Sequence, residues 1–286
     1  MAELVDALDS KSCTGNGVWV RFPPRVLNLR EIWGFFVLCK IYIMPELFGL
    51  LGKSLGHSFS PAFFSQYFLQ NQIEAEYRLF EIPEIQQCTN VFDLNPKGLN
   101  VTIPYKEEII PYIDELDTIA KEIGAVNVIK FENGRKIGYN TDVYGFHQSI
   151  KPFLTFHHER ALIFGTGGAS KAVAHVFRSI GIDVFYVSQN PNNRPNHFSY
   201  SDVNELMIAS CKVIVNCTPI GTFPNINECI DIPFNALTID HLVIDLIYNP
   251  PLTSLLKKSQ NAGATVLNGS SMLKEQALKS WDIWNR

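Results

Sequence analysis

The segment that most constrains the fold is a glycine-rich turn with the sequence GTGGAS at residues 165–170. The apolar run ALIF ends directly before this turn, and a segment with helical spacing follows at residues 169–180. Glycines let the backbone turn tightly and approach a pyrophosphate, whose charge then lies at the N-terminus of the helix. The order of strand, turn and helix therefore predicts a dinucleotide-binding unit. A glycine-rich connection that binds nothing is the alternative.

The chain beyond residue 44 alternates short apolar runs with longer segments of helical period, which is typical of α/β proteins. Before the glycine turn, the pattern predicts strands at residues 46–51, 76–82, 98–103, 126–131 and 136–139. Helices are predicted at residues 61–72, 83–92 and 115–123. After the turn, strands are predicted at residues 183–188, 212–218 and 242–248, with the spacing of βαβ units in a parallel sheet.

These patterns predict an α/β chain with two domains. Residues 44–145, together with about 268–286, would form an N-terminal α/β substrate domain, because the last helix, at residues 271–284, can return to it. Residues 146–267 would form a Rossmann-like dinucleotide-binding domain with a doubly wound parallel sheet. A chain of 286 residues is long enough for two domains that each bury a core.

The first 43 residues do not share this pattern. Their apolar stretch at residues 33–39 is too short to span a membrane, and Lys40 follows it where an export signal needs small residues. The N-terminal segments MAELVDALDSKSC and GVWVRFPP resemble the translation of a transfer-RNA gene. We therefore expect the protein to start at Met44, which mass spectrometry of the native N-terminus would test. A disordered extension is the alternative.

The composition limits the class of partner. A formal net charge of -4 provides no basic surface for nucleic acid or for an anionic membrane. The six cysteines form no CxxC pair and no cluster with histidine at metal-ligand spacing, so we expect reduced thiols and no bound metal. A small-molecule substrate and a cytoplasmic location are the resulting expectations, for a monomer or a homodimer.

Eight segments beyond residue 44 resemble, in order and in spacing, the signature blocks of shikimate dehydrogenases. They are GHSFSP, NVTIPYK, GAVNVI, YNTDVYGF, GTGGASKA, NCTPIGT, DLIYNPPLT and NGSSMLKEQA. The resemblance implies reversible reduction of 3-dehydroshikimate to shikimate with NADPH, on the pathway to aromatic amino acids. A quinate/shikimate dehydrogenase that uses NAD, and a homologue that binds ligands without catalysis, are the alternatives.

Two residues in these blocks are predicted to be catalytic. Reduction of a ketone needs a hydride and a proton for the oxygen that becomes an alkoxide. Lys106, at the end of NVTIPYK, can stabilise the developing negative charge and donate the proton. Asp142 would orient Lys106 and the substrate hydroxyl, and the residues leave open which of the pair moves the proton. Without the resemblance, Lys106 would be a surface lysine and Asp142 a helix cap.

By the same resemblance, several polar residues contact the substrate. Ser58 and Ser60 would hold its carboxylate, and Thr102, Asn127 and Gln276 its ring hydroxyls, with Tyr248 as a further contact. An amide such as Asn127, within an apolar strand, needs hydrogen-bond partners when it is buried. His57 is interpreted as structural, because the histidines form no cluster.

The glycine turn and three later segments carry the residues that the resemblance assigns to the cofactor. They are Gly165, Gly167, Gly168, Ala169, Thr218, Gly221 and Gly269, with Ser188 and Gln189 at the adenosine ribose. The family usually has Asn-Arg-Thr where this chain has Ser188, Gln189 and Asn190. No acidic residue for a 2'-hydroxyl and no arginine for a 2'-phosphate stands there, although Arg194 is close in sequence. The resemblance implies NADP as the cofactor. Because the arginine is missing, we expect the protein to discriminate less strongly against NAD.

Overall fold

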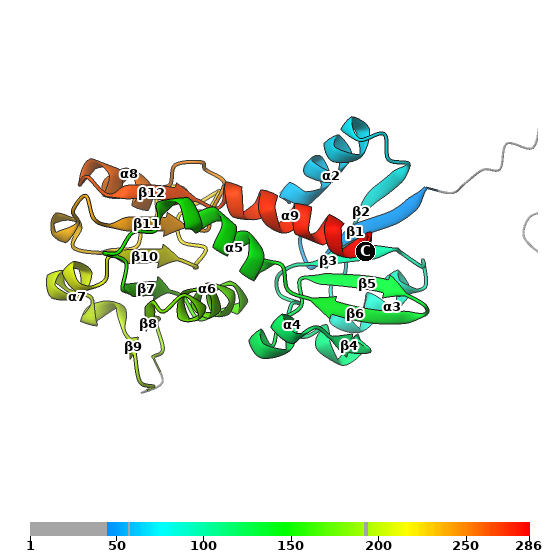
Figure 1. Ribbon diagram of the computed structural model, residues 1–286, viewed down its shortest axis with the longest axis horizontal. Helices are drawn as coiled ribbons and strands as arrows, with labels where there is room; N and C mark the ends of the chain where they lie inside the picture. Colours follow the sequence, from blue (N-terminus) through cyan, green and yellow to red (C-terminus); the bar gives the residue numbers. More distant parts are fainter. Residues whose placement is uncertain (1–44, 57, 192–193) are drawn as a thin grey trace, which may run out of the picture. The chain divides into compact units, whose positions relative to one another are not determined.

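The computed structural model describes residues 45–56, 58–191 and 194–286, and residues 45–286 form one compact unit. The predicted start at Met44, the extension before it and His57 lie outside the described residues. Two six-stranded sheets organise the described part of the chain (Figure 1).

The first sheet is mixed and has the strand order β2-β1-β3-β5-β6-β4. Its strands are β1 (Glu46–Gly52), β2 (Ala75–Glu81), β3 (Gly98–Val101), β4 (Glu115–Leu116), β5 (Val128–Glu132) and β6 (Arg135–Tyr139). Strand β1 pairs in parallel with β2 and β3, whereas β5 pairs antiparallel with β3 and β6. Because β1 and β3 are parallel neighbours, the loops that follow them leave the sheet at the same edge.

Helices cover the first sheet. They are α2 (Phe59–Gln70), α3 (Cys88–Phe92), α4 (Thr118–Ile123) and, from the end of the chain, α9 (Ser270–Trp284), with 3-10 turns at Ile85–Gln87 and Ile110–Tyr112. Helix α9 runs back from the second sheet to the first (Figure 1), where the rings of Phe48 and Trp284 lie 4.9 Å apart. Trp284 Nε1 also donates a hydrogen bond to the Ile129 carbonyl at 3.1 Å. The prediction that the last helix returns to the first domain is confirmed.

The second sheet is entirely parallel, with the order β12-β11-β10-β7-β8-β9. Its strands are β7 (Arg160–Phe164), β8 (Asp183–Val187), β9 (His197–Phe198), β10 (Val213–Asn216), β11 (Leu242–Asp245) and β12 (Thr265–Asn268). The helices around it are α5 (Asp142–Ile150), α6 (Gly168–Ser179), α7 (Glu205–Ser210) and α8 (Ser254–Asn261), with 3-10 turns at Lys151–Phe153, Tyr200–Asp202 and Phe234–Ala236. Apolar residues of α5 and α6 pack in one core cluster and those of α7 and α8 in another. This arrangement is the predicted doubly wound Rossmann-like sheet.

Several predicted boundaries are wrong for local physical reasons. The helix predicted at residues 115–123 begins only at Thr118, because Asp117 caps it by accepting a hydrogen bond from the Ala120 amide at 2.9 Å. The two residues before the cap pair with β6 instead. The helix predicted at residues 61–72 spans Phe59–Gln70, so Pro61 lies within its first turn, where no amide hydrogen is needed.

Other elements were shorter than predicted or were missed. The strand predicted at residues 242–248 ends at Asp245, since the Ile247 amide donates to the Asp245 side chain rather than to a neighbouring strand. The strands predicted at 98–103 and 212–218 end at Val101 and Asn216, and the helix predicted at 83–92 is a 3-10 turn followed by α3. The sequence analysis did not predict α5, α7, α8, β4, β9 or β12.

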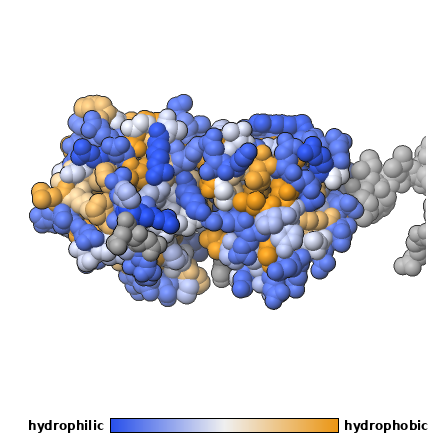
Figure 2. All heavy atoms as spheres, turned by 90° about the horizontal axis from the view of Figure 1, so that it is seen from below, coloured by the Kyte–Doolittle hydropathy of each residue, from blue (hydrophilic) through white to orange (hydrophobic). Residues whose placement is uncertain are grey.

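The surface of the described residues is mainly polar. The face in Figure 2 is mostly hydrophilic, with smaller apolar areas between the hydrophilic ones. Apolar side chains that are largely exposed include Leu69, Ile103, Phe156, Leu206 and Ile239. In the described part of the chain, no helix is long and apolar enough to cross a membrane. The four cysteines within it, Cys88, Cys211, Cys217 and Cys229, are free thiols.

Candidate active site

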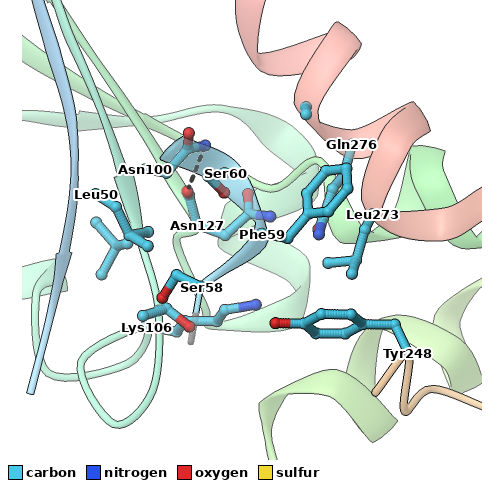
Figure 3. Close-up of a pocket in the computed structure, with 13 residues that line it drawn as sticks. Leu50, Ser58, Phe59, Ser60, Asn100, Lys106, Asn127, Tyr248, Leu273 and Gln276 are labelled. Carbon is cyan, nitrogen blue, oxygen red and sulfur yellow. Dashed lines mark hydrogen bonds between the residues drawn. The ribbon is translucent and has the colours of Figure 1, made fainter. Parts of the chain in front are cut away.

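A cavity of about 150 Å³ opens where the loops after β1 and β3 leave the first sheet (Figure 3). Its lining includes seven of the predicted site residues, namely Ser58, Ser60, Thr102, Lys106, Asn127, Tyr248 and Gln276. Tyr248 comes from the loop after β11 and Gln276 from α9, so segments far apart in the sequence meet here. In Figure 3 the Tyr248 ring extends toward the amine of Lys106.

Lys106 and Asp142 form an ion pair at the edge of this cavity. The distance from Lys106 Nζ to Asp142 Oδ2 is 2.6 Å, and the two side chains are 18% and 4% exposed. Asp142 is the first residue of α5, where the helix dipole favours a negative charge. Its other oxygen accepts a hydrogen bond from Asn127 Nδ2 at 2.9 Å. The carboxylate is thus held from both sides, and the lysine amine keeps one face toward the cavity.

The side-chain amide of Asn127 makes hydrogen bonds within the protein. Its amide nitrogen donates to Asp142 and to Thr141 Oγ1, at 2.9 and 3.1 Å, and its oxygen accepts from the Thr141 backbone amide at 2.8 Å. These bonds satisfy the buried amide and hold the residue that precedes α5. In this arrangement Asn127 supports Asp142, and its predicted contact with a substrate hydroxyl stays a prediction.

Asn100 lines the same cavity and was missed by the sequence analysis. Its amide nitrogen donates to Ser280 Oγ at 2.9 Å, and its oxygen accepts from the Tyr77 hydroxyl at 2.8 Å. Burial raises the pKa of that tyrosine, so its hydroxyl remains a donor. The signal was the period of two along the strand, since residues two apart point to the same face and Asn100 stands two positions before Thr102.

The glycine turn leads from β7 into α6, as predicted. Gly165 has φ +101°, a conformation that favours glycine, and a side chain there would approach Thr218 and the Cys217 backbone at about 3.2–3.3 Å. Gly167 is the N-cap of α6, and open space surrounds the position of its missing Cβ. Gly168 and Ala169 open the helix. Amide groups at such an end can bind a pyrophosphate, so the turn fits a dinucleotide.

A second cavity, of about 390 Å³, lies beside this turn. It is lined by Gly165, Thr166, Ser188, Gln189, Asn190, Tyr200, Thr218, Pro219 and Ile220. None of these lining residues carries a charge, and Arg194 is not among them. The Ser188 hydroxyl is buried and has no hydrogen-bond partner among the described residues, which leaves it for a ligand.

The remaining two predicted glycines lie outside the lining of both cavities, as do Gly167, Gly168 and Ala169. Gly221 has φ +95° in the loop after β10. Gly269 lies between β12 and α9, and a Cβ there would be 2.0 Å from the Leu246 carbonyl oxygen. Glycine at residue 269 therefore lets the turn before α9 pass directly against the loop after β11.

An ion pair connects the loop that carries Lys106 with the helix that follows the glycine turn. Glu107, next to Lys106, accepts from Lys171 in α6 at 2.7 Å. Both side chains are close to half exposed, so the pair is worth at most about 1 kcal/mol. It nevertheless places the loop of Lys106 beside the first turns of α6.

Comparisons with known proteins identify relatives of this chain in sequence and in fold. The family model of the shikimate dehydrogenase substrate binding domain matches residues 50–129. A shikimate dehydrogenase (NADP(+)) of Aquifex aeolicus is 38% identical, over 86% of this chain and 93% of the relative. The crystal structure of shikimate dehydrogenase from the same organism superposes with a TM-score of 0.75 at 36% identity, covering 85% of this chain and 93% of that one. Quinate dehydrogenase of Corynebacterium glutamicum in complex with NAD superposes with a TM-score of 0.76 at 26% identity, covering 84% and 93%.

Proposed function

The chain belongs to the shikimate dehydrogenase family, and we propose that it catalyses the reversible NADP-dependent conversion of shikimate into 3-dehydroshikimate, within aromatic amino acid biosynthesis. It is an oxidoreductase that acts on a CH–OH group. The observation that carries the proposal is the Lys106–Asp142 ion pair, at 2.6 Å, on the edge of a polar cavity of small-molecule size.

We assign the proton transfer to this pair. A nicotinamide cofactor held at the glycine turn would supply or accept the hydride, and the residues of this chain handle the proton and the charge. In the reducing direction, the Lys106 ammonium donates a hydrogen bond to the carbonyl oxygen and stabilises the alkoxide as its charge develops. Asp142 pairs with the lysine amine and fixes its direction, since its own position is set by Asn127 and by the start of α5. A proton passed from the Lys106–Asp142 pair to the alkoxide completes the reduction.

The other polar residues of the cavity are assigned to substrate recognition. Ser58 and Ser60 bind the carboxylate, and Thr102 and Gln276 bind ring hydroxyls, with Tyr248 closing the side opposite the first sheet. Each such group rejects a substrate that leaves it unpaired, at a cost of about 1–3 kcal/mol. Residues 44–145 with 268–286 would form the domain that holds the substrate, and residues 146–267 the domain that holds the cofactor.

A steady-state assay tests the reaction, the substrate and the cofactor together. Purified protein is supplied with shikimate and NADP, with shikimate and NAD, and with quinate and each cofactor, while nicotinamide absorbance is followed. We expect the cofactor to be reduced fastest when shikimate and NADP are supplied together. Absence of turnover with shikimate and either cofactor would refute the proposal, and faster turnover of quinate with NAD would support the second candidate.

The second candidate, a quinate/shikimate dehydrogenase that uses NAD, is favoured by one observation. The cavity beside the glycine turn has no charged residue in its lining, so it offers no cation for a 2'-phosphate. The intact Lys106–Asp142 pair argues against a homologue that only binds ligands, since a binder needs no acid/base group.

Gln189→Arg should strengthen the preference for NADP. An arginine at the end of β8 can bind a 2'-phosphate bidentately, so the ratio of kcat/KM for NADP to that for NAD is expected to rise about tenfold. The measurement is kcat/KM for both cofactors at saturating shikimate. Gln260→Arg, which adds the same charge at an exposed position of α8, serves as the control. An unchanged ratio in Gln189→Arg would mean that the ribose lies elsewhere.

A further inference from the structure

Three buried polar side chains meet where β10 and β11 end. Asn216 is the last residue of β10, Asp245 is the last residue of β11, and Thr253 is the N-cap of α8. None of the three is more than 1% exposed. Asp245 Oδ1 accepts a hydrogen bond from Asn216 Nδ2 at 3.0 Å, and Asp245 Oδ2 accepts from Thr253 Oγ1 at 2.6 Å.

Asn216 connects this carboxylate to the loop that follows β10. The Asn216 oxygen accepts from the backbone amide and from the hydroxyl of Thr218, at 2.8 and 2.6 Å. Its amide nitrogen also donates to the Ile220 carbonyl at 3.3 Å. Thr218 and Ile220 line the 390 Å³ cavity. The loop on the cofactor side is therefore shaped by an amide whose orientation Asp245 sets.

The same carboxylate holds the loop that follows β11. The Ile247 amide donates to Asp245 Oδ1 at 3.1 Å, and the next residue, Tyr248, lines the 150 Å³ cavity. Thr253 ends this loop, and its hydroxyl accepts from the Leu256 amide at 3.3 Å. A hydrogen bond from Gly269 to the Ile247 carbonyl, at 3.1 Å, attaches the turn before α9 to the same loop.

We infer that Asp245 is a positioning residue that holds the cofactor loop with Thr218 and the substrate loop with Tyr248 in one geometry, so that both ligands are presented to each other. Asp245 lines neither cavity, so its role is to position other residues rather than to contact a ligand. Its effect passes through Asn216 on one side and through Ile247 and Thr253 on the other. This inference rests on the proposed function, because that function defines the two ligands.

The charge of Asp245 suits this role. Burial raises its pKa to about 6, while the hydrogen bonds from Thr253, Ile247 and Asn216 lower it. The titratable groups that interact with it are the thiols of Cys217 and Cys229. Burial raises the pKa values of both thiols, so both are neutral near pH 7. The charge of Lys258 in α8 lowers the pKa of Cys229 in part. All three bonds need an acceptor, which the ionised carboxylate provides. Protonation would place a donor against the Thr253 hydroxyl or remove an acceptor from Asn216 and Ile247.

The first test removes one hydrogen bond at Thr253. Thr253→Val should raise KM for shikimate and KM for NADP together by about tenfold, because a hydrogen bond to a charged group is lost. Thr253→Ser keeps the hydroxyl and should restore both constants to within about twofold of wild type. Tyr248→Phe is the comparison for a change on one side only, with KM raised for shikimate but not for NADP. Thr253→Val that folds with neither KM changed, or with only one changed, would overturn the inference.

The second test removes the charge and also covers the case in which Thr253→Val fails to fold. Asp245→Asn is close in shape, but its amide nitrogen must face either Thr253 or the Asn216 and Ile247 amides and can accept from none of them, so both KM values should again rise at pH 7.5. In the wild type, KM for shikimate should rise as the pH falls through about 6, where Asp245 takes up a proton. Asp245→Asn should lose this dependence. His57→Gln should keep it, which excludes the histidine next to Ser58 in sequence as the source.

The outcomes separate this inference from the proposed function. A wild-type protein that does not oxidise shikimate would refute the function itself. An active wild type, with Asp245→Asn equal to it in both KM values and in the pH profile, would refute only the role of Asp245.

Discussion

Lys106→Ala is expected to lower kcat for shikimate oxidation by about 10²–10⁴-fold, the usual contribution of a positioned acid/base group. Among the described residues that line the cavity, Lys106 is the one cation, and its partner Asp142 is almost fully buried. Without the amine, none of these lining residues offers a positive charge to the developing alkoxide. KM for NADP should stay near the wild-type value, because the cofactor residues lie beside the glycine turn. Steady-state kinetics with varied shikimate and varied NADP measure both effects.

Two further variants sharpen this result. Lys106→Arg keeps the positive charge but does not release its proton near neutral pH, so it should remain strongly impaired if the lysine itself transfers the proton. Lys97→Ala removes a lysine that pairs with Glu46 at 2.7 Å on the surface, and it should keep wild-type activity. A loss of less than tenfold in Lys106→Ala would contradict the assignment.

Gly269→Ala is expected to lower the free energy of unfolding by about 3 kcal/mol, which corresponds to a fall in Tm of roughly 6–12 °C. An added Cβ would lie 2.0 Å from the Leu246 carbonyl oxygen and 2.7 Å from its carbonyl carbon. These are backbone atoms, so no side-chain rotation relieves the clash. Either the turn before α9 or the loop of Tyr248 must move, and we expect turnover to fall as well.

Thermal and denaturant unfolding of the two matched alanine variants provide the check. Gly56→Ala is the control, since apart from its chain neighbours no atom of the described residues lies within 4 Å of the position of its Cβ. This control should change stability by less than about 0.5 kcal/mol. Equal stability of Gly269→Ala and Gly56→Ala would contradict the close contact between Gly269 and the Leu246 backbone, because the two segments would then have room for an added methyl group.

The local features of the chain were predictable because each depends on neighbouring residues. The glycine turn at residues 165–170 lies between β7 and α6 as expected, since an apolar run, flexible glycines and a helical pattern stand next to one another. The doubly wound sheet and the return of α9 are confirmed, and so is the family. The individual site residues remain predictions, although the structure gathers seven of them around one cavity.

The errors occurred where a side chain competes with a regular pattern. Asp117 moves the start of a predicted helix to Thr118 by capping it, and Asp245 ends a predicted strand by accepting a hydrogen bond from the Ile247 amide. Asn100 was missed because a polar residue in a short strand has no distinct meaning until its neighbours are known. Those neighbours, Tyr77 and Ser280, are 23 and 180 residues away in the sequence.

By itself, the sequence determined the family and the alternating order of strands and helices, and it predicted an acid/base lysine and aspartate and a pyrophosphate turn. Only the tertiary structure decided which side chains are in contact. The 2.6 Å contact between Lys106 and Asp142 spans 36 residues, and the Asn216–Asp245 contact spans 29. Such distances depend on which strands become neighbours in a sheet, and that is set by packing of the whole core rather than by any local pattern.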